Sequence, residues 1–369
     1  MQQHHFLMLG YTLTYTFIST LLFFTFYQLG ASLLELSLYF AFMNLVPIIV
    51  ITSMRSVNIR TNFILTFILM SLLALFLSTV TEKSPIILIG VITGVAFYLF
   101  WVPINILFFS KIGDGEHAFS SGKYYALVSI GRAIIPFFAG LLAAKYTHSF
   151  VYALASFIFA LLILYAITLP TKKITYDLKK AYKSMRFISV LIFLEGMRGQ
   201  IFFMAIPLFT LTFIHTELKL GAFLSYLGIA GIIAALILTK ISDRQKKRAA
   251  YVYPITILLA LFCISLFFAR TPLLWGVASA VLFFLNALAG PFEITVLIDN
   301  VEDKTSAMTA REVLLASGRM FASLVIASVY LFTGTFYLSY LLIGTAYLLY
   351  PLIVFAKKVY ATDSISASD

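Results

Sequence analysis

The chain has 369 residues, of which 62% are hydrophobic and only 11% are charged, and its formal net charge is +11. A water-soluble domain of this length cannot bury so much apolar side chain, so the composition indicates an integral membrane protein. The positive charge lies in predicted loops and does not indicate nucleic-acid binding, and the single cysteine, Cys263, excludes a disulfide framework.

Twelve apolar segments follow one another along the chain, and each is long enough to cross the hydrocarbon layer, which takes about 20 helical residues. They comprise residues 6–28, 34–53, 62–80, 85–109, 124–145, 149–169, 187–213, 219–240, 250–269, 272–298, 307–333 and 336–356. The loops on the side of both termini hold nineteen Lys and Arg residues, Arg311 among them, whereas the opposite loops hold four. This distribution predicts a multi-pass protein of the cell membrane with both termini in the cytoplasm.

The second half of the chain repeats the first at an offset of about 188 residues. Pro103 aligns with Pro291, and Arg132 aligns with Arg319 after a one-residue slip. Internal duplication is typical of secondary transporters built from two related bundles. The sequence therefore predicts an all-α fold with two six-helix bundles (1–169 and 187–358), a polar cytoplasmic linker (170–186) and a cytoplasmic tail (359–369).

Polar and aromatic side chains form stripes at helical spacing along three predicted helices. They are Tyr11, Tyr15 and Ser19 in the first, Tyr98, Trp101 and Asn105 in the fourth, and Asn286 and Glu293 in the tenth. Such stripes suit a cavity for a small molecule, with aromatic rings for stacking and amides for orientation. An aromatic belt at the membrane surface is the alternative for Tyr98 and Trp101, but Asn105 lies deeper on the same face.

The fifth predicted helix carries a pattern of small residues and one proline. Gly122, Gly131, Pro136 and Gly140 recur at spacings that let neighbouring helices approach closely. Pro136 allows a bend and frees a carbonyl that a neighbour must satisfy. Ordinary packing of small residues is the alternative interpretation.

Charged residues within the apolar segments are costly and usually face a cavity or a partner. Glu195 and Arg198 lie three residues apart, so they share a helix face on which Phe202 follows, and we expect them to pair. Glu195 is our candidate for a protonatable coupling residue, with Glu293 as the second candidate. A buried structural ion pair is the alternative.

Arg132 and Arg319 occupy equivalent, buried positions in the two repeats. We expect Arg319 to pair with Glu293, which lies at comparable depth on the preceding predicted helix. Arg132 has no acid at the corresponding place. It therefore remains a candidate for an anionic substrate group, a lipid phosphate or backbone carbonyls.

The loop after the eighth predicted helix reads Ile-Ser-Asp-Arg-Gln-Lys-Lys-Arg over 241–248. Asp243 can bond free amides at the start of a helix in the other half, and Arg244 can pair with Asp299. These residues would form a latch at the cytoplasmic gate. A basic loop that only sets the topology is the alternative.

This loop and the fifth-helix pattern resemble two signatures of the major facilitator superfamily. One is an Asp-Arg-x-Gly-Arg-Arg/Lys loop, and the other is a glycine and proline motif of exporters that exchange substrate for protons. Ile135 and Ala139 depart from the second signature. The resemblance implies two bundles around a midplane cavity, alternating access, and a monomer. It further implies proton-coupled export of a small organic or amphiphilic compound.

Three other functions stay open at this point. The acids at 299–303, including Asp303, could hold Mg²⁺ in a membrane-embedded transferase, although a solvated loop explains them more simply. A lipid or glycolipid flippase and a solute importer of the same fold are the others. No cofactor, metal or nucleic acid is predicted, and the expected partners are a small-molecule substrate, protons and the lipid bilayer.

Overall fold

The computed structural model describes residues 2–109, 117–242 and 249–357, and the side chains of 5–109, 129–234 and 251–357. The helices of the first half are α1 (Gln2–Gln28), α2 (Leu33–Ser53), α3 (Ile59–Leu77), α4 (Ile86–Phe109), α5 (His117–Lys145) and α6 (His148–Ile167). The short helix α7 (Leu178–Ser184) follows. The second half contains α8 (Ile188–Gln200), the π-helix η1 (Ile201–Ala205), α9 (Ile206–Thr210), α10 (Glu217–Ser242), α11 (Ala249–Ser265), α12 (Pro272–Asp299), α13 (Lys304–Thr333), α14 (Tyr337–Tyr347) and α15 (Leu349–Ala356).

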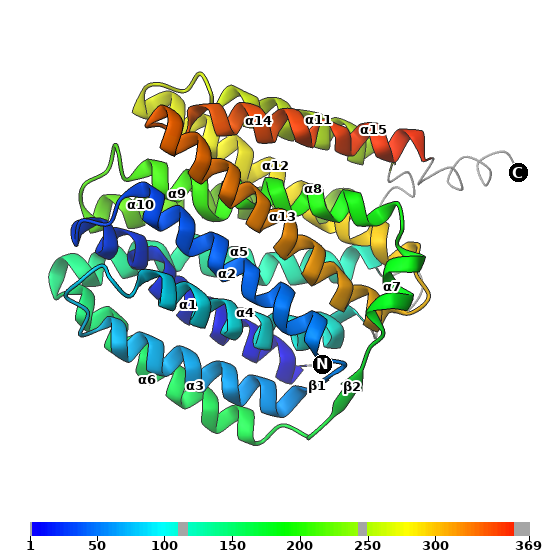
Figure 1. The fold of residues 1–369 in the computed structure, drawn as a ribbon, viewed down its shortest axis with the longest axis horizontal. Helices are drawn as coiled ribbons and strands as arrows, with labels where there is room; N and C mark the ends of the chain where they lie inside the picture. The colour runs from blue at the N-terminus through cyan, green and yellow to red at the C-terminus, as the bar shows by residue number, and fades with distance from the viewer. Residues whose placement is uncertain (1, 110–116, 243–248, 358–369) are drawn as a thin grey trace, which may run out of the picture.

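Ten helical segments among the described residues are long and apolar enough to cross a membrane. The helix α5 in the first half and α11 in the second run alongside these segments, which completes the predicted twelve-helix fold with two six-helix halves (Figure 1). Each predicted span coincides with a helical segment. The largest difference is the start of α5 at His117 rather than at residue 124, because the polar residues there lower the hydropathy.

The helices begin and end where the sequence supplies polar caps or glycine. Ser32 and Glu35 form a capping box before α2, in which each side chain binds the backbone N–H of the other residue. Thr147 caps α6 in a similar way. Gly334 ends α13 with φ of +68°, a conformation that residues with a Cβ rarely adopt.

The two halves meet along two long helix contacts. The helix α5 packs along α10, and α2 packs along α13. The start of α1, the end of α15 and α7 lie at one end of the bundle, which we call the linker end (Figure 1). The outer helices α3 and α6 lie at one margin, and α11, α14 and α15 lie at the other.

The fifth-helix pattern lies at the contact between the halves. Pro136 has no N–H for the Arg132 carbonyl, and that carbonyl instead lies against Gly228 of α10, where an added Cβ would be 2.4 Å from its oxygen. Gly140 lies against the backbone of Glu217, and Gly131 lies against Thr12 of α1. Gly122 is in α5, outside the residues whose side-chain surroundings are described.

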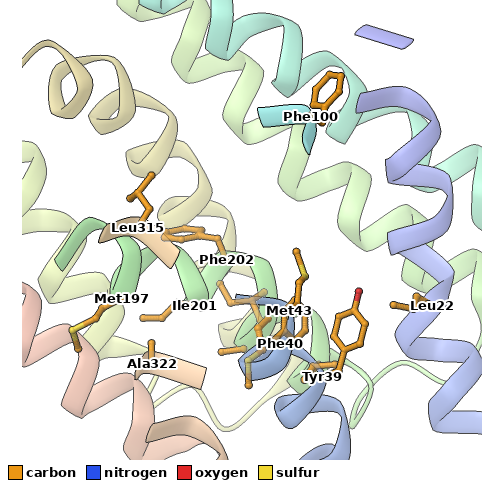
Figure 2. Close-up of a cluster of buried hydrophobic side chains, with 14 of the residues drawn as sticks. Leu22, Tyr39, Phe40, Met43, Phe100, Met197, Ile201, Phe202, Leu315 and Ala322 are labelled. Carbon is orange, nitrogen blue, oxygen red and sulfur yellow. The ribbon is translucent and has the colours of Figure 1, made fainter. Parts of the chain in front are cut away.

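A buried hydrophobic cluster continues from one half into the other. Figure 2 shows Phe40 and Met43 of α2 in this cluster together with Ile201 and Phe202 of η1 and Leu315 of α13. Since apolar packing continues across the contact, the two halves share part of their core.

The predicted linker contains more structure than its polar sequence suggests. Strand β2 (Lys173–Thr175) pairs antiparallel with β1 (Ser56–Asn58), and Val57 lies opposite Ile174. After it, α7 begins with Asp177 as its cap. The Asp177 N–H donates to Ser306 Oγ at 2.9 Å, which attaches this part of the linker to α13.

Candidate functional site

Arg198 and Glu293 form a buried ion pair inside the second half. Arg198 Nη2 lies 2.7 Å from Glu293 Oε2, and the two side chains are 4% and 1% exposed. The Tyr347 hydroxyl donates to Glu293 Oε1 at 2.6 Å, and the Tyr347 ring lies 5.0 Å from the Arg198 guanidinium. Three helices, α8, α12 and α14, are thereby joined through one carboxylate.

A second network crosses from one half to the other. Arg311 Nη2 of α13 donates to Glu195 Oε1 of α8, and Arg311 Nη1 lies 3.5 Å from Glu312 Oε1. Glu312 Oε1 accepts a hydrogen bond from Asn105 Nδ2 of α4 at 2.8 Å. One arginine is therefore shared by two buried carboxylates, and one of these is bonded to the first half.

The predicted partners of these charges were wrong. The expected Glu195–Arg198 and Glu293–Arg319 pairs are replaced by Glu195–Arg311 and Arg198–Glu293. The i and i+3 spacing does put Glu195 and Arg198 on one face, but α8 packs against both α12 and α13. Each side chain therefore reaches a different neighbouring helix.

The predicted position of Arg311 in a loop was also wrong. Arg311 lies within α13 and is only 5% exposed. The signal that could have found it was its position inside the predicted span 307–333, next to another charge, Glu312. Adjacent charges in an apolar segment are expensive and indicate a buried network.

Arg132 and Arg319 converge on one aromatic ring. Their guanidinium carbons lie 4.9 Å and 5.1 Å from the centroid of the Phe203 ring in η1. Arg319 also lies 5.8 Å from the Phe97 ring of α4. Tyr15 of α1 stacks with Tyr11, with the ring centroids 5.6 Å apart. Both arginines were predicted from the sequence, whereas Phe203 was not.

Several predicted cavity residues gather near this point. A pocket between the halves is lined by Asn44, Pro47, Ile51, Phe97, Tyr98, Trp101, Val102, Glu312, Ala316 and Arg319. Its cavity volume of about 10 Å³ is enough for about one water molecule. A larger molecule therefore needs α13 to move away from α2 and α4.

Other predicted cavity residues lie elsewhere. Tyr11 is fully buried and stacks on Phe100 at 3.7 Å, so it belongs to the core of the first half. Ser19 bonds to the Thr16 carbonyl on its own helix. Phe202 packs edge-on against Phe283, with the ring centroids 5.3 Å apart. Asn286, the last of these residues, lies half-buried on α12.

The predicted gate is only partly within the described structure. Asp243 and Arg244 lie outside the described residues, and Asp299 is exposed at the end of α12. Asp303 is the cap of α13, where it accepts the Ser306 N–H at 3.0 Å. Among the described residues, no group of three His, Cys, Asp or Glu could hold a metal ion.

The cap gives a small, testable effect on stability. Burial raises the pKa of Asp303. The hydrogen bonds from Ser306 and the positive charge of Lys180 lower it by a larger amount, so the pKa lies below its usual value. We expect Asp303→Ala to cost about 0.5–2 kcal/mol of unfolding free energy at neutral pH, and Asp303→Asn to cost less, because Asn also caps. The wild-type advantage over Asn should vanish as pH falls through the folded-state pKa. Denaturant titration in detergent measures this, and equal losses for Ala and Asn would contradict the capping role.

At the end opposite the linker, a polar cluster also joins the halves. Glu217 Oε1 of α10 lies 3.0 Å from His148 Nε2 of α6 and 3.4 Å from Gln28 Nε2 of α1. His148 Nδ1 lies 3.3 Å from the Thr25 hydroxyl. The halves are thus bonded to each other near both ends of the bundle.

Comparison with known proteins gives a consistent result. A family model described as Major Facilitator Superfamily matches residues 5–323. The uncharacterized protein YqgE of Bacillus subtilis is 27% identical over an alignment of 233 positions, which covers 58% of this chain and 53% of that protein. The chain therefore matches about half the length of that curated relative.

Several solved structures share the fold over almost the whole chain. The human organic anion transporter TETRAN has a TM-score of 0.71 at 14% identity, covering 96% of this chain and 98% of that one. The E. coli fucose:proton symporter FucP has a TM-score of 0.68 at 14% identity, covering 97% of each chain. The nucleoside transporter NupG has a TM-score of 0.68 at 15% identity, covering 97% and 99%.

Proposed function

Because the chain belongs to the major facilitator superfamily, we propose that it exports a small organic or amphiphilic compound in exchange for protons, by alternating access. The family makes it a membrane transporter rather than an enzyme. In this proposal the linker end faces the cytoplasm, and a monomer is the working unit. The bundles 1–169 and 187–358 move against each other around the central arginines.

The observation that supports coupling best is the sharing of Arg311. Protonation of Glu195 removes the negative charge that holds Arg311 Nη2, so the guanidinium turns toward Glu312, already 3.5 Å away. Arg311 then competes with Asn105 for the Glu312 carboxylate. A proton taken up in the second half thereby weakens a contact with the first half.

Glu293 and Arg198 are the second candidates for coupling. Their bond and the Tyr347 contact stay inside the second half, so breaking them does not act directly on the contact between the halves. For this reason we prefer Glu195 as the site of proton binding.

Export rather than import is supported only by the resemblance of the fifth-helix pattern to the exporter signature. Gly131, Pro136 and Gly140 lie at tight contacts with α1 and α10, where α5 has to slide when the halves move. The proposed latch of Asp243, Arg244 and Asp299 would close the cytoplasmic gate.

Proteoliposomes that contain an internal pH-sensitive dye test the coupling. A panel of drugs, sugars, amino acids and organic anions is added to wild type, Glu195→Gln and Glu293→Gln. We expect one class of compound to evoke proton movement in wild type, at least about tenfold less in Glu195→Gln, and a smaller loss in Glu293→Gln. Glu82→Gln, at an exposed loop position, is the matched control and should behave as wild type.

Two outcomes would contradict the proposal. Uphill, proton-driven transport that persists in Glu195→Gln removes that residue from coupling. Transport by wild type that is unchanged after the pH gradient is collapsed removes proton coupling altogether. Direction is read separately, because an exporter accumulates its substrate in everted membrane vesicles.

A further inference from the structure

Arg132 of the first half and Arg319 of the second lie near one ring, and we infer that they bind the carboxylate of an aromatic anion. This names the substrate class and rests on the proposed transport function. The carboxylate would lie between the guanidinium groups beside Phe203, and the aromatic part would contact neighbouring rings.

The two guanidinium groups are close enough to act on one ligand. Their carbons lie 4.9 Å and 5.1 Å from the same ring centroid, so their separation cannot exceed the sum of these distances. Arginine presents a planar array of donors that matches the two oxygens of a carboxylate. Two such groups near one ring favour a ligand with a delocalised negative charge.

The backbone explains why Phe203 is available to both arginines. Pro207 has no N–H to donate to the Phe203 carbonyl. The N–H of the preceding residue, Ile206, donates to the carbonyl of Ile201, five residues back rather than the four of an α-helix. The resulting π-helix changes the helical face. Phe203 is partly exposed, whereas its neighbours Phe202 and Met204 are buried.

The charge inside the spans also favours an anion. Away from the helix ends, the spans with described side chains contain four arginines (Arg132, Arg198, Arg311 and Arg319) and three glutamates (Glu195, Glu293 and Glu312). One positive charge is in excess when all are ionised. Because an excess charge within a membrane is costly, a bound anion that balances it gains free energy.

Other aromatic side chains lie near the same place. Phe97 of α4 lies 5.8 Å from the Arg319 guanidinium. Trp101 lines the adjoining pocket together with Arg319. These rings would provide apolar and stacking contacts for an aromatic body, while the arginines fix the charged end.

The position in both repeats connects binding to movement. Arg132 and Arg319 are equivalent residues of α5 and α13, so one anion would be held by both halves at once. It could remain bound while the halves open on one side and close on the other, which alternating access requires.

Direct binding to the purified full-length protein in detergent tests the inference. Phenylacetate is the anionic probe, and phenethylamine and phenethyl alcohol are cationic and neutral probes with a similar body. Isothermal titration calorimetry should detect phenylacetate binding to wild type, with weaker binding of the other two. Arg132→Gln and Arg319→Gln should each weaken phenylacetate binding about 10- to 100-fold, the loss expected for one charge-assisted contact.

A matched control comes from Arg270, in the turn between α11 and α12. Its guanidinium also lies over a ring, 3.5 Å from the Tyr337 centroid. Arg270→Gln should leave phenylacetate affinity unchanged. Arg132→Lys and Arg319→Lys keep the charge but lose the planar donors, and they should fall between wild type and the Gln variants.

Equal affinity of wild type for the three probes would overturn the inference, and this comparison holds even if a Gln variant fails to fold. So would phenylacetate binding that neither Gln variant weakens. Binding is measured without transport, which separates the two proposals. Phenylacetate that binds through the arginines but never moves protons contradicts the transport proposal, whereas proton-coupled movement of cations alone contradicts this inference.

Discussion

Replacing Arg198 with Met is expected to lower the free energy of unfolding by about 3–5 kcal/mol, because Glu293 then stays buried without its cation. The Glu293 side chain is 1% exposed, so water cannot take over the lost contact. Only the Tyr347 hydroxyl would remain bonded to it among the groups described. Unfolding of the purified protein in mixed micelles, followed by circular dichroism, measures the change.

The double variant Arg198→Met with Glu293→Met should lose less than either single variant, because no uncompensated charge is left behind. The exposed pair of Lys83 and Glu35, whose side chains are 44% and 36% exposed, is the control. Lys83→Met should change stability by at most about 1 kcal/mol. A loss in the double variant that equals the sum of the two single losses would show that the charges do not depend on each other.

Gly228→Ala is expected to slow transport strongly and to cost about 1–3 kcal/mol of unfolding free energy, because it pushes the halves apart. The added Cβ would lie 2.4 Å from the Arg132 carbonyl oxygen and 2.5 Å from the Ala133 Cα. These are backbone atoms, so no side chain can turn aside, and α5 has to move away from α10.

Gly231, one turn further along α10, is the matched control. A Cβ there would have as its closest neighbour the Ala287 Cβ at 3.8 Å, an ordinary contact. Gly231→Ala should therefore be neutral or slightly stabilising, since Ala favours the helix. Thermal unfolding and substrate flux of the two variants in the same liposomes give the answer. Similar behaviour of both would mean that the α5–α10 contact is loose.

The helical spans could be predicted because the membrane imposes their length and hydropathy, and the caps and glycines mark their ends. Pro136 and its glycines likewise predicted a close helix contact, which the structure has between α5 and α10. Such features are local or depend only on the family fold. Predicting them does not require knowing which side chains are in contact in the folded protein.

The partners of the charges could not be predicted in this way. Spacing puts Glu195 and Arg198 on one face, but the angle at which α8 lies between α12 and α13 decides which helix each one reaches. Arg311 was assigned to a loop because a count of basic residues takes no account of burial. Phe203 was missed because the π-helix at η1 shifts its side chain relative to the regular α-helical stripe.

In the segment between the halves, two consecutive residues are hydrogen-bonded to different halves. Tyr176 donates its N–H to the Arg55 carbonyl at 3.1 Å and its hydroxyl to the Ile51 carbonyl at 3.2 Å, both in the first half. The next residue, Asp177, donates its N–H to Ser306 Oγ of the second half. A flexible tether would set only how often the halves meet. The junction between Tyr176 and Asp177 is instead bonded to both halves. Rotation of one half against the other therefore has to change the backbone torsion angles at this junction, which makes it a hinge.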